Sequence, residues 1–405
     1  MEFRRATASD VPDILQIMSS AFDRPPGSDK YQRDKRRLEN EIATHWVLVR
    51  AGQVVGATHI VRDDIQVGGS TIAKADVGEV CIAPDYQGEG LGTALMQNVV
   101  KQLRSDGYPI SRLGGYRRFY ERFGWLPFPR GYVDFALSGL TSRGGYTDPV
   151  SYLDRPTEDA RIRPYDGSRD AEPCAEHYTA FNSNRTGAKP ARSFGPDAGD
   201  PWRVVYERGG VVRAYVFASR NAPPHTLLSP AASISDGACD PEDTQPLGEA
   251  LRHILRQAAI AGADSVRARL PLDASLYNLY RDASCGFVPT LWQSSEGGNM
   301  LQILSLGALF EAIAPELQDR LQATNQPSGR VDLRVNTSSI RLTWNGTELM
   351  IDAGEQDAIP LGQDDLMKLV LGLVPIEHLL HANTENIGLL RSLFPVQGTA
   401  TGVWG

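Results

Sequence analysis

The chain has 405 residues, more than one hydrophobic core usually supports, so two or three domains are expected. Its formal net charge of -8 argues against nucleic acid as a partner and mildly favours a cationic substrate. Four cysteines lie far apart without Cys-x-x-Cys spacing, which indicates reduced thiols rather than disulfides or zinc. No apolar run is long enough to span a bilayer, and a folded pattern begins at the first residues. We therefore expect a cytoplasmic protein without a membrane partner.

The first third of the chain predicts a strand, two helices and a meander of strands. Residues 3–6 suit a short strand, and Ser9 or Asp10 can cap a helix whose apolar positions recur at helical spacing up to Phe22. A second, charged helix is expected over residues 30–42. Four strands then follow one another: residues 46–49, 54–60, 65–67 and 80–82.

A glycine-punctuated turn follows the last of these strands. Gly88, Gly90 and Gly92 lie in this turn, and a helix begins near Leu91 and ends near Gly107. Glycines let the backbone approach an anion closely, and the first amides of a helix present its positive dipole end. The lysine of a P-loop and the glycine spacing of a dinucleotide site are both missing. The pattern therefore predicts a pyrophosphate site that needs neither a lysine nor a metal.

Tyr120 and Gly124 form a second informative pattern. Gly124 suits the C-terminal end of a short helix that carries the tyrosine. The alternative is that Tyr120 is an ordinary half-buried aromatic residue, and Tyr116, four residues earlier on the same helical face, could replace it. Arg117, Arg118 and Arg122 lie close to these residues; contact with phosphates is one explanation for them, and surface charge is the simpler one.

The middle of the chain echoes the first third. Residues 141–149 are rich in Gly, Ser, Thr and Pro, which marks a boundary. The echoed strands and helix are residues 162–165, 203–206, 211–218 and 247–261. Acidic residues over 236–243 stand where a second glycine turn should be, and they would repel a pyrophosphate. We therefore expect no second anion site.

The pattern changes again from residue 306. An apolar helical stripe over residues 309–317 precedes three alternating strands, and Asn345-Gly346 suits a turn between two of them. Helices are expected at 363–373 and 376–381. His378 and His381 share a helical face, but solvated histidines explain them better than a metal does. Three domains are therefore expected: residues 1–150, 151–303 and 304–405.

These patterns together resemble one protein family. Gln87-x-x-Gly90-x-Gly92, directly after Ile82-Ala83-Pro84, resembles the acyl-coenzyme-A motif of the GNAT N-acetyltransferase superfamily, and Tyr120 with Gly124 resembles the signature that ends its catalytic domains. A decayed second unit and a tail similar to a sterol-carrier-protein-like domain resemble the enhanced intracellular survival (Eis) type. The resemblance implies a mixed α+β fold, with two tandem GNAT-like domains of mixed sheets flanked by helices and a smaller α+β domain. It also implies a homo-oligomer, a ring-like hexamer.

The resemblance further implies acetyl-coenzyme A as co-substrate, without a metal. Tyr120 would give a proton to the departing thiolate, and the carboxylate of the last residue, Gly405, would be the general base. The family usually ends in an aromatic residue, so Glu79 and Asp76 on the motif strand compete for that role. Gln87 replaces an arginine found in some members. The implied coenzyme contacts are Val80, Cys81, Ile82, Gln87, Gly88, Glu89, Gly90, Leu91, Gly92, Thr93, Gly115 and Tyr116.

We therefore expect an N-acetyltransferase that moves an acetyl group directly to the amine of a small molecule or peptide. The acceptor is not specified, because variable loops such as residues 22–31 build acceptor pockets. Two alternatives remain: a carrier of lipids or hydrophobic ligands, and a catalytically silent acyl-coenzyme-A-binding scaffold. A continuous apolar cavity in residues 306–405 would favour the carrier, whereas acetyl transfer or hydrolysis would exclude the scaffold.

Overall fold

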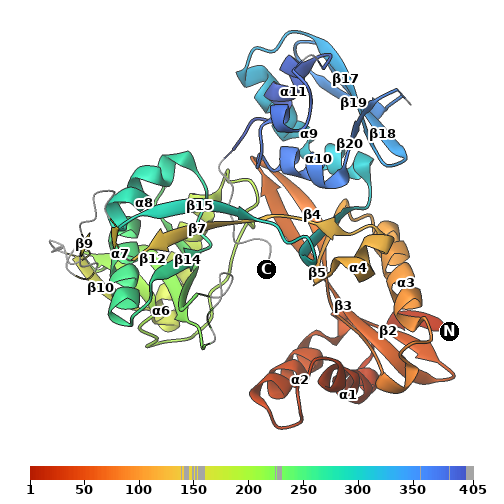
Figure 1. Ribbon diagram of the computed structural model, residues 1–405, viewed down its shortest axis with the longest axis horizontal. Helices are drawn as coiled ribbons and strands as arrows, with labels where there is room; N and C mark the ends of the chain where they lie inside the picture. Colours follow the sequence, from red (N-terminus) through yellow and green to blue (C-terminus); the bar gives the residue numbers. More distant parts are fainter. Residues whose placement is uncertain are drawn as a thin grey trace.

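Three large sheets, each with its own helices, organise the chain in the computed structural model (Figure 1). The structure describes residues 1–137, 139–140, 146–147, 150, 153, 160–223, 225, 230–355, 357–382 and 384–397. Two seven-stranded sheets and a four-stranded sheet lie within these residues, together with a small pair, β8 (Gly139–Leu140) and β9 (Tyr146–Thr147). The expected mixed α+β class is confirmed.

The first sheet has the strand order β1-β2-β3-β4-β5-β16-β6, and only β4 and β5 pair in parallel. Its strands are β1 (Glu2–Arg5), β2 (His45–Arg50), β3 (Gln53–Val67), β4 (Ser70–Ile82), β5 (Ile110–Tyr116), β6 (Leu126–Pro127) and β16 (Gly297–Ile303). The expected break between strands at 54–60 and 65–67 is wrong, because β3 runs through it. Asp63 lies opposite Lys74 of β4, and their ion pair at 3.2 Å accommodates charged residues inside the strand.

Helices cover both faces of this sheet. They are η1 (Ala8–Asp10), α1 (Val11–Ala21), α2 (Asp29–Glu41), η2 (Ile42–Thr44), η3 (Pro84–Tyr86), α3 (Leu91–Ser105), α4 (Arg117–Tyr120) and η4 (Glu121–Phe123). Val47 packs with residues of α1, whereas its neighbour Trp46 packs with residues of α3. Adjacent strand residues point to opposite faces, so α1 and α3 lie on opposite sides of the sheet. The expected helices at 9–22, 30–42 and 91–107 are confirmed as α1, α2 and α3.

The second sheet has the order β10-β11-β12-β13-β14-β7-β15. Its strands are β7 (Arg130–Ala136), β10 (Ala160–Pro164), β11 (Arg203–Arg208), β12 (Val211–Arg220), β13 (Ala232–Cys239), β14 (Ser265–Ala268) and β15 (Phe287–Trp292), and its helices are α6 (Gly167–Asn182), α7 (Gln245–Ile260), η5 (Ala274–Leu276) and α8 (Tyr277–Ala283). Residues 236–243 were expected to form a decayed turn. This is wrong for the first half of the segment, because residues 236–239 belong to β13. Asp236 fits inside the strand because Tyr215 donates to it at 2.9 Å and Arg192 pairs with it at 2.8 Å.

The first two sheets exchange strands. β7 follows β6 in the chain but lies in the second sheet, and β16 follows β15 but lies between β5 and β6 in the first. Figure 1 shows β7 and β15 running side by side from the second sheet toward the first, where short connections join them to β6 and β16. Both connections lie away from residues 150 and 303, so the proposed domain boundaries do not coincide with the change of sheet.

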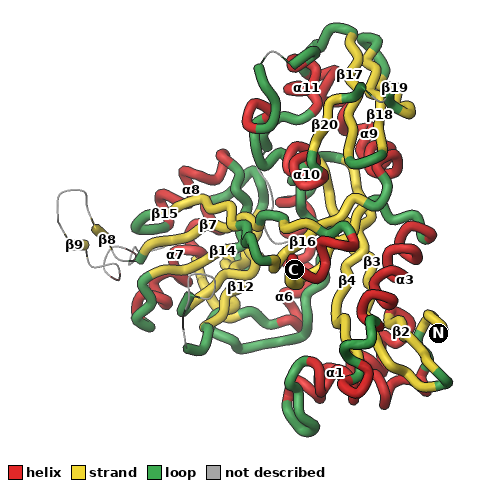
Figure 2. The backbone as a smooth tube through the Cα atoms, turned by 45° about the vertical axis from the view of Figure 1, so that its right-hand side comes forward, coloured by secondary structure: helices red, strands yellow, loops and turns green. Residues whose placement is uncertain are grey.

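The tail packs its helices and its sheet around one apolar core that also includes residues of the first sheet. Figure 2 shows the helices of the tail gathered beside its sheet. Its elements are α9 (Leu306–Ala323), β17 (Gly329–Val335), β18 (Ser338–Trp344), β19 (Leu349–Ala353), β20 (Ile359–Leu361), α10 (Gln363–Val370), η6 (Ile376–His378) and α11 (Ile387–Leu393). The expected long helix and three strands are confirmed. The helix expected at 376–381 is only the short turn η6, and α10 ends early because Gly372 turns the chain with a φ of 64°.

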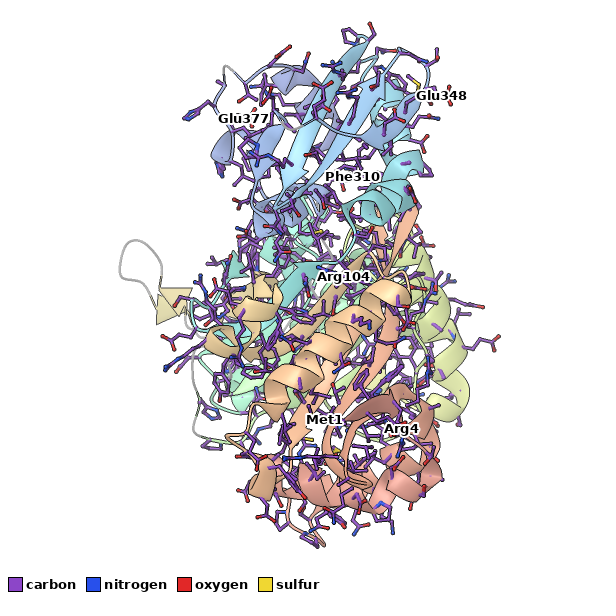
Figure 3. All side chains as sticks on the ribbon, turned by 90° about the vertical axis from the view of Figure 1, so that its right-hand side faces the viewer. Met1, Arg4, Arg104, Phe310, Glu348 and Glu377 are labelled. Atoms are coloured by element: carbon purple, nitrogen blue, oxygen red, sulfur yellow. The ribbon has the colours of Figure 1, made fainter. Side chains whose placement is uncertain are left out.

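β3 and β4 form a long hairpin whose tip contacts both other units. Gln66 donates from Nε2 to the carbonyl of Ser183 at 2.6 Å, and the amide of Gly68 donates to Thr186 Oγ1 at 3.0 Å. The amide of Gly69 donates to Glu316 of α9 at 2.8 Å. Phe310, in the same helix, lies near the base of the tail (Figure 3). One hairpin of the first sheet therefore joins all three units.

Gln363 is a second link between the tail and the first sheet. Its side chain is buried, with 5% of the residue exposed. Its carbonyl oxygen accepts from the amide of Ile303 at 3.1 Å, and its Nε2 donates to the carbonyl of Gly124. Gln302 donates to the neighbouring carbonyl of Phe123 at 3.0 Å. The turn after α4 is therefore held by amide side chains from β16 and from the tail.

We expect Gln363→Leu to lower the free energy of unfolding by about 1–3 kcal/mol, because two partly buried backbone groups lose their partner. Urea unfolding followed by tryptophan fluorescence measures the change. Gln322→Leu, at an exposed glutamine of the same tail, is the matched control. Equal unfolding midpoints for the two variants would contradict the bridging role of Gln363.

Candidate active site

β4 and β5 part in the middle of the first sheet. Their parallel ladder covers only Lys74–Val77 of β4 against Ile110–Leu113 of β5. Just beyond it, Glu79 has a left-handed backbone with a φ of 53°, and two residues of β4, Glu79 and Val80, oppose the single Thr58 of β3. Such a bulge bends a strand and ends its pairing. Backbone groups of β4 beyond the bulge therefore have no partner in β5.

The direction of these free groups follows from one hydrogen bond. The amide of Ala83 donates to Val55 of β3 at 2.9 Å. Successive backbone groups alternate between the two sides of a strand, so the amide of Ile82, and that of Val80 two residues earlier, face the side of β5. Gln87 donates to the carbonyl of Ile82 at 3.1 Å and lies at the end of this opening.

Cys81 lies between these residues but points away from the opening. Its thiol contacts the carbonyl of Ala57 at 3.7 Å, and burial raises the pKa of the thiol to about 12. A thiol with this pKa stays protonated at neutral pH, so Cys81 is a core residue rather than a nucleophile.

The glycine turn presents free amides at the start of α3. Gly88 and Gly90 have φ values of 84° and 80°, and Gly90 is the N-cap of the helix. The first amides with a helical acceptor are those of Thr93 and Ala94, both bonded to the carbonyl of Gly90. Within the described residues, the amides of residues 88–90 donate to no backbone or side-chain acceptor. An anion would find both these donors and the helix dipole.

Arg122 is a charged side chain that lies beside this turn. It donates to Thr93 Oγ1 at 3.0 Å and stacks on Phe119 at 4.7 Å. It also lines a hollow of about 360 Å³ that contains Arg104 of α3. For Arg122, sequence analysis weighed phosphate contact against surface charge and favoured surface charge. Glu89, in contrast, is paired with Arg50 at the surface.

Tyr120 lies over β5 where the two strands part. A Cβ atom on Gly115 would stand 2.1 Å from the Tyr120 ring, so only glycine allows this close approach. Burial, with a smaller contribution from nearby Cys81, raises the pKa of Tyr120 to about 12. Tyr116 is 80% exposed, and its backbone pairs with Gly297 of β16. The structure therefore brings Tyr120 and Gly115 together and leaves the Tyr116 side chain in solvent.

The two candidate carboxylates of β4 have different partners. Glu79 forms an ion pair with Arg37 of α2 and lies 3.4 Å from His45 Nε2. Asp76 is bonded to the fully buried Lys74 at 2.6 Å. The third candidate, the carboxylate of Gly405, lies outside the described residues. Sequence analysis missed His45 and His59, which face each other across β2 and β3.

Comparisons with known proteins find an acetyltransferase domain over the residues that build this site. Residues 2–128 match the family model described as an acetyltransferase (GNAT) domain. A Bacillus subtilis protein that carries the provisional name of a ribosomal protein bS18-alanine N-acetyltransferase is 25% identical over 138 residues, which cover 31% of this chain and 80% of that protein. The chain is therefore an acyltransferase with a GNAT domain in its first third.

Solved structures extend the likeness of the fold to the whole chain. A GCN5-related N-acetyltransferase from Anabaena variabilis superposes with a TM-score of 0.64 at 14% identity, covering 98% of both chains. Eis1 from Mycobacterium abscessus superposes with a TM-score of 0.59 at 16% identity, covering 99% of both chains. The three-unit architecture is therefore shared with both.

The burial of Tyr120 predicts a stability difference in alkali. Because its folded-state pKa of about 12 exceeds the usual value of about 10, the unfolded state loses this proton first as pH rises. Above pH 10, we expect the free energy of unfolding of wild type to fall more steeply than that of Tyr120→Phe, by up to about 1.4 kcal/mol per pH unit. Urea unfolding of both proteins between pH 9 and pH 11 measures this difference, and parallel pH curves would contradict the buried hydroxyl.

Proposed function

We propose that the protein transfers the acetyl group of acetyl-coenzyme A directly to an amine. The observation that carries this proposal is the parting of β4 and β5 between the free amides of the glycine turn and the buried Tyr120. A thioester carrier has a diphosphate, an extended amide-bearing arm and a thiol end, and the site offers a matching group to each. No step of the proposal requires a metal.

The coenzyme would lie along the first sheet from the turn to the tyrosine. The free amides of the turn over residues 88–92 would bind the diphosphate, with Thr93 at its edge, and Arg122 would add a positive charge nearby. The arm would pair with the free amides of Val80 and Ile82 as a missing strand would. A backbone donor at the thioester oxygen would contribute about 3 kcal/mol to stabilising the oxyanion, by analogy with other acyl-transfer sites.

Tyr120 would act on the departing sulfur. Its raised pKa keeps the hydroxyl protonated, so it can donate a hydrogen bond to sulfur from the start and its proton as the C–S bond breaks. The amine must lose a proton before it attacks, and Gly405 or Glu79 would supply the base. Asp76 is less suitable, because its carboxylate is already bonded to a buried lysine.

The remaining expectations extend this proposal. We propose domains at 1–150, 151–303 and 304–405, with a sterol-carrier-like last domain, in a cytoplasmic homo-oligomer such as a hexamer. No helix among the described residues is both long and apolar enough to cross a bilayer. The lipid-carrier alternative has less support, because the apolar faces of the tail pack against one another and the hollow at its sheet is lined by charged residues such as Asp332 and Glu355.

Coenzyme binding is tested by Gly90→Ala. Residue 90 must adopt a left-handed backbone, which costs about 1–2 kcal/mol with a side chain and moves the amides of the turn. We expect calorimetry with coenzyme A to show roughly tenfold weaker binding. Gly107→Ala is the matched control, because Gly107 has a similar φ of 75° at the other end of α3 and equally open surroundings. Absence of heat in wild type, or equal affinities in both variants, would refute the proposed coenzyme site.

Tyr120→Phe tests the role of the hydroxyl. We expect kcat to fall by about 10²-fold or more, with the affinity for coenzyme A unchanged, because the hydroxyl acts on the leaving sulfur. A screen of polyamines, aminoglycosides and lysine peptides with free-thiol detection supplies the acceptor. Tyr116→Phe removes an exposed hydroxyl four residues away and should leave turnover unchanged. Equal turnover of Tyr120→Phe and wild type would remove this tyrosine from the mechanism.

A further inference from the structure

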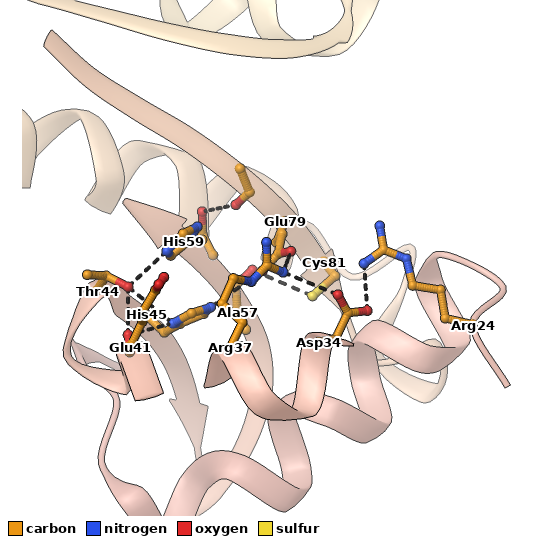
Figure 4. A network of polar contacts seen from close by, with 12 residues as sticks. Arg24, Asp34, Arg37, Glu41, Thr44, His45, Ala57, His59, Glu79 and Cys81 are labelled. Atoms are coloured by element: carbon orange, nitrogen blue, oxygen red, sulfur yellow. Dashed lines mark hydrogen bonds and ion pairs between the residues drawn. The ribbon is translucent and has the colours of Figure 1, made fainter. Parts of the chain in front are cut away.

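Glu79 stands at the centre of a polar network on the α2 side of the opening (Figure 4). One carboxylate oxygen pairs with Arg37, and the other lies 3.4 Å from His45 Nε2. Arg37 also bonds Asp34 at 3.3 Å, and Asp34 pairs with Arg24 at 2.6 Å. The carboxylate is therefore held in one orientation toward His45.

The proton positions on His45 follow from its other partner. Its Nδ1 lies 3.2 Å from the carbonyl oxygen of Glu41, which can only accept. The assignment that satisfies this contact places the ring proton on Nδ1, so a neutral His45 turns the lone pair of Nε2 toward Glu79. Two acceptors then face each other. One added proton would convert this repulsion into a charge-assisted hydrogen bond.

The neighbouring His59 is fixed in the same way. The hydroxyl of Thr44 donates to the Glu41 carbonyl at 2.6 Å, so its oxygen accepts from His59 Nε2 at 2.8 Å. Burial, together with His45 and Arg37, lowers the pKa of His59 to about 4. Burial and Arg37 lower the pKa of His45, against the opposing influence of Glu41. Both rings are therefore neutral at pH 7, and no proton lies between His45 Nε2 and the Glu79 carboxylate.

The same three side chains also offer metal ligands. Ligand atoms of His45, His59 and Glu79 lie within 4.8 Å of one another. However, the two rings are stacked, with centroids 4.3 Å apart and planes 20° apart. An imidazole lone pair lies in the plane of its ring, so two stacked rings cannot direct both lone pairs at one ion. The positive charge of Arg37 beside Glu79 further disfavours a metal ion. The geometry therefore suits a shared proton better than a metal ion.

The face of the sheet beside this network is open. His45, His59 and Gly78 are neighbours across β2, β3 and β4. A Cβ atom added to Gly78 would meet no atom within 4 Å, so the sheet is open beside the two rings. The side chain of Glu79 is 13% exposed and that of His45 only 1%. An incoming amine would therefore reach Glu79 first, with His45 behind it.

We propose that Glu79 and His45 together accept the proton of the acceptor amine, with Arg37 as the positioning residue of the carboxylate. This inference rests on the proposed function. An ammonium group gives one proton to the pair, which becomes an imidazolium–carboxylate hydrogen bond, and the freed nitrogen lone pair forms the C–N bond. As the C–S bond breaks, its electron pair goes to sulfur, which takes the proton of Tyr120. Tyr120 recovers the second proton of the nitrogen, and the pair releases the first proton to water.

The shared proton can be measured without any acceptor. NMR titration of the full chain labelled with ¹⁵N-histidine follows the protonation of His45. The titratable and charged groups that face this ring are Arg37, Glu41, His59 and Glu79. We expect Glu79→Gln to lower the titration midpoint of His45 by about one pH unit, a tenfold change. Asp76→Asn, which removes a carboxylate of the same strand that is bonded to Lys74, should not shift it. An unchanged midpoint in Glu79→Gln, or stoichiometric Zn²⁺ binding that shifts both ring signals, would overturn the proposal.

Activity gives the second test, with acetyl-coenzyme A and spermidine as the probe amine. We expect His45→Phe to lower kcat/KM about 10²-fold at pH 7, and we expect the deficit to shrink above pH 9 as the amine loses its own proton in water. His59→Phe keeps the ring stack and should stay within threefold of wild type. If wild type binds coenzyme A and transfers acetyl while His45→Phe matches it from pH 6 to pH 10, the proton-accepting pair is refuted and the function stands. If wild type does neither, the function fails, and the titration still decides the pair.

Discussion

The left-handed backbone of Glu79 is the constraint on which the site depends. A non-glycine residue in this conformation costs about 1–2 kcal/mol, and the ion pair with Arg37 helps to hold it. The resulting bulge ends the β4–β5 ladder after Val77. It thereby frees backbone amides on one edge of the strand and turns a carboxylate toward two histidines on one face. One backbone distortion thus produces both the free strand edge and the candidate base.

The second and third units act on this site through the turn that follows Tyr120. Gln302 of β16 and Gln363 of the tail each donate to a carbonyl of this turn. β16 belongs to the first sheet but follows the strands of the second unit in the chain, so the turn is held by a late strand of the first sheet and by the tail. The tail is therefore a structural support of the site, whatever else it binds.

Local patterns made part of this site predictable from the sequence. The glycine turn, helix α3 and the Tyr120–Gly124 pattern are set by residues within a few positions of one another, and each appears where the sequence predicts it. The exchange of β7 and β16 depends on pairing between residues far apart, such as Leu301 with Arg112, which no local pattern encodes. His45 and His59 escaped notice for the same reason, since register across two strands brings them together. The long strand β3 was divided wrongly because the partner of Asp63, Lys74, lies across the hairpin.

The β3–β4 hairpin has one end at the bulge and the other at the second and third units. β3 alone has 15 residues and so extends about 50 Å. Its cross-strand ladder with β4 runs from the tip, where Gly69 donates to Glu316 of α9, to the bulge beside Val80. The same two strands that border the gap are therefore anchored at their far end by the other two units.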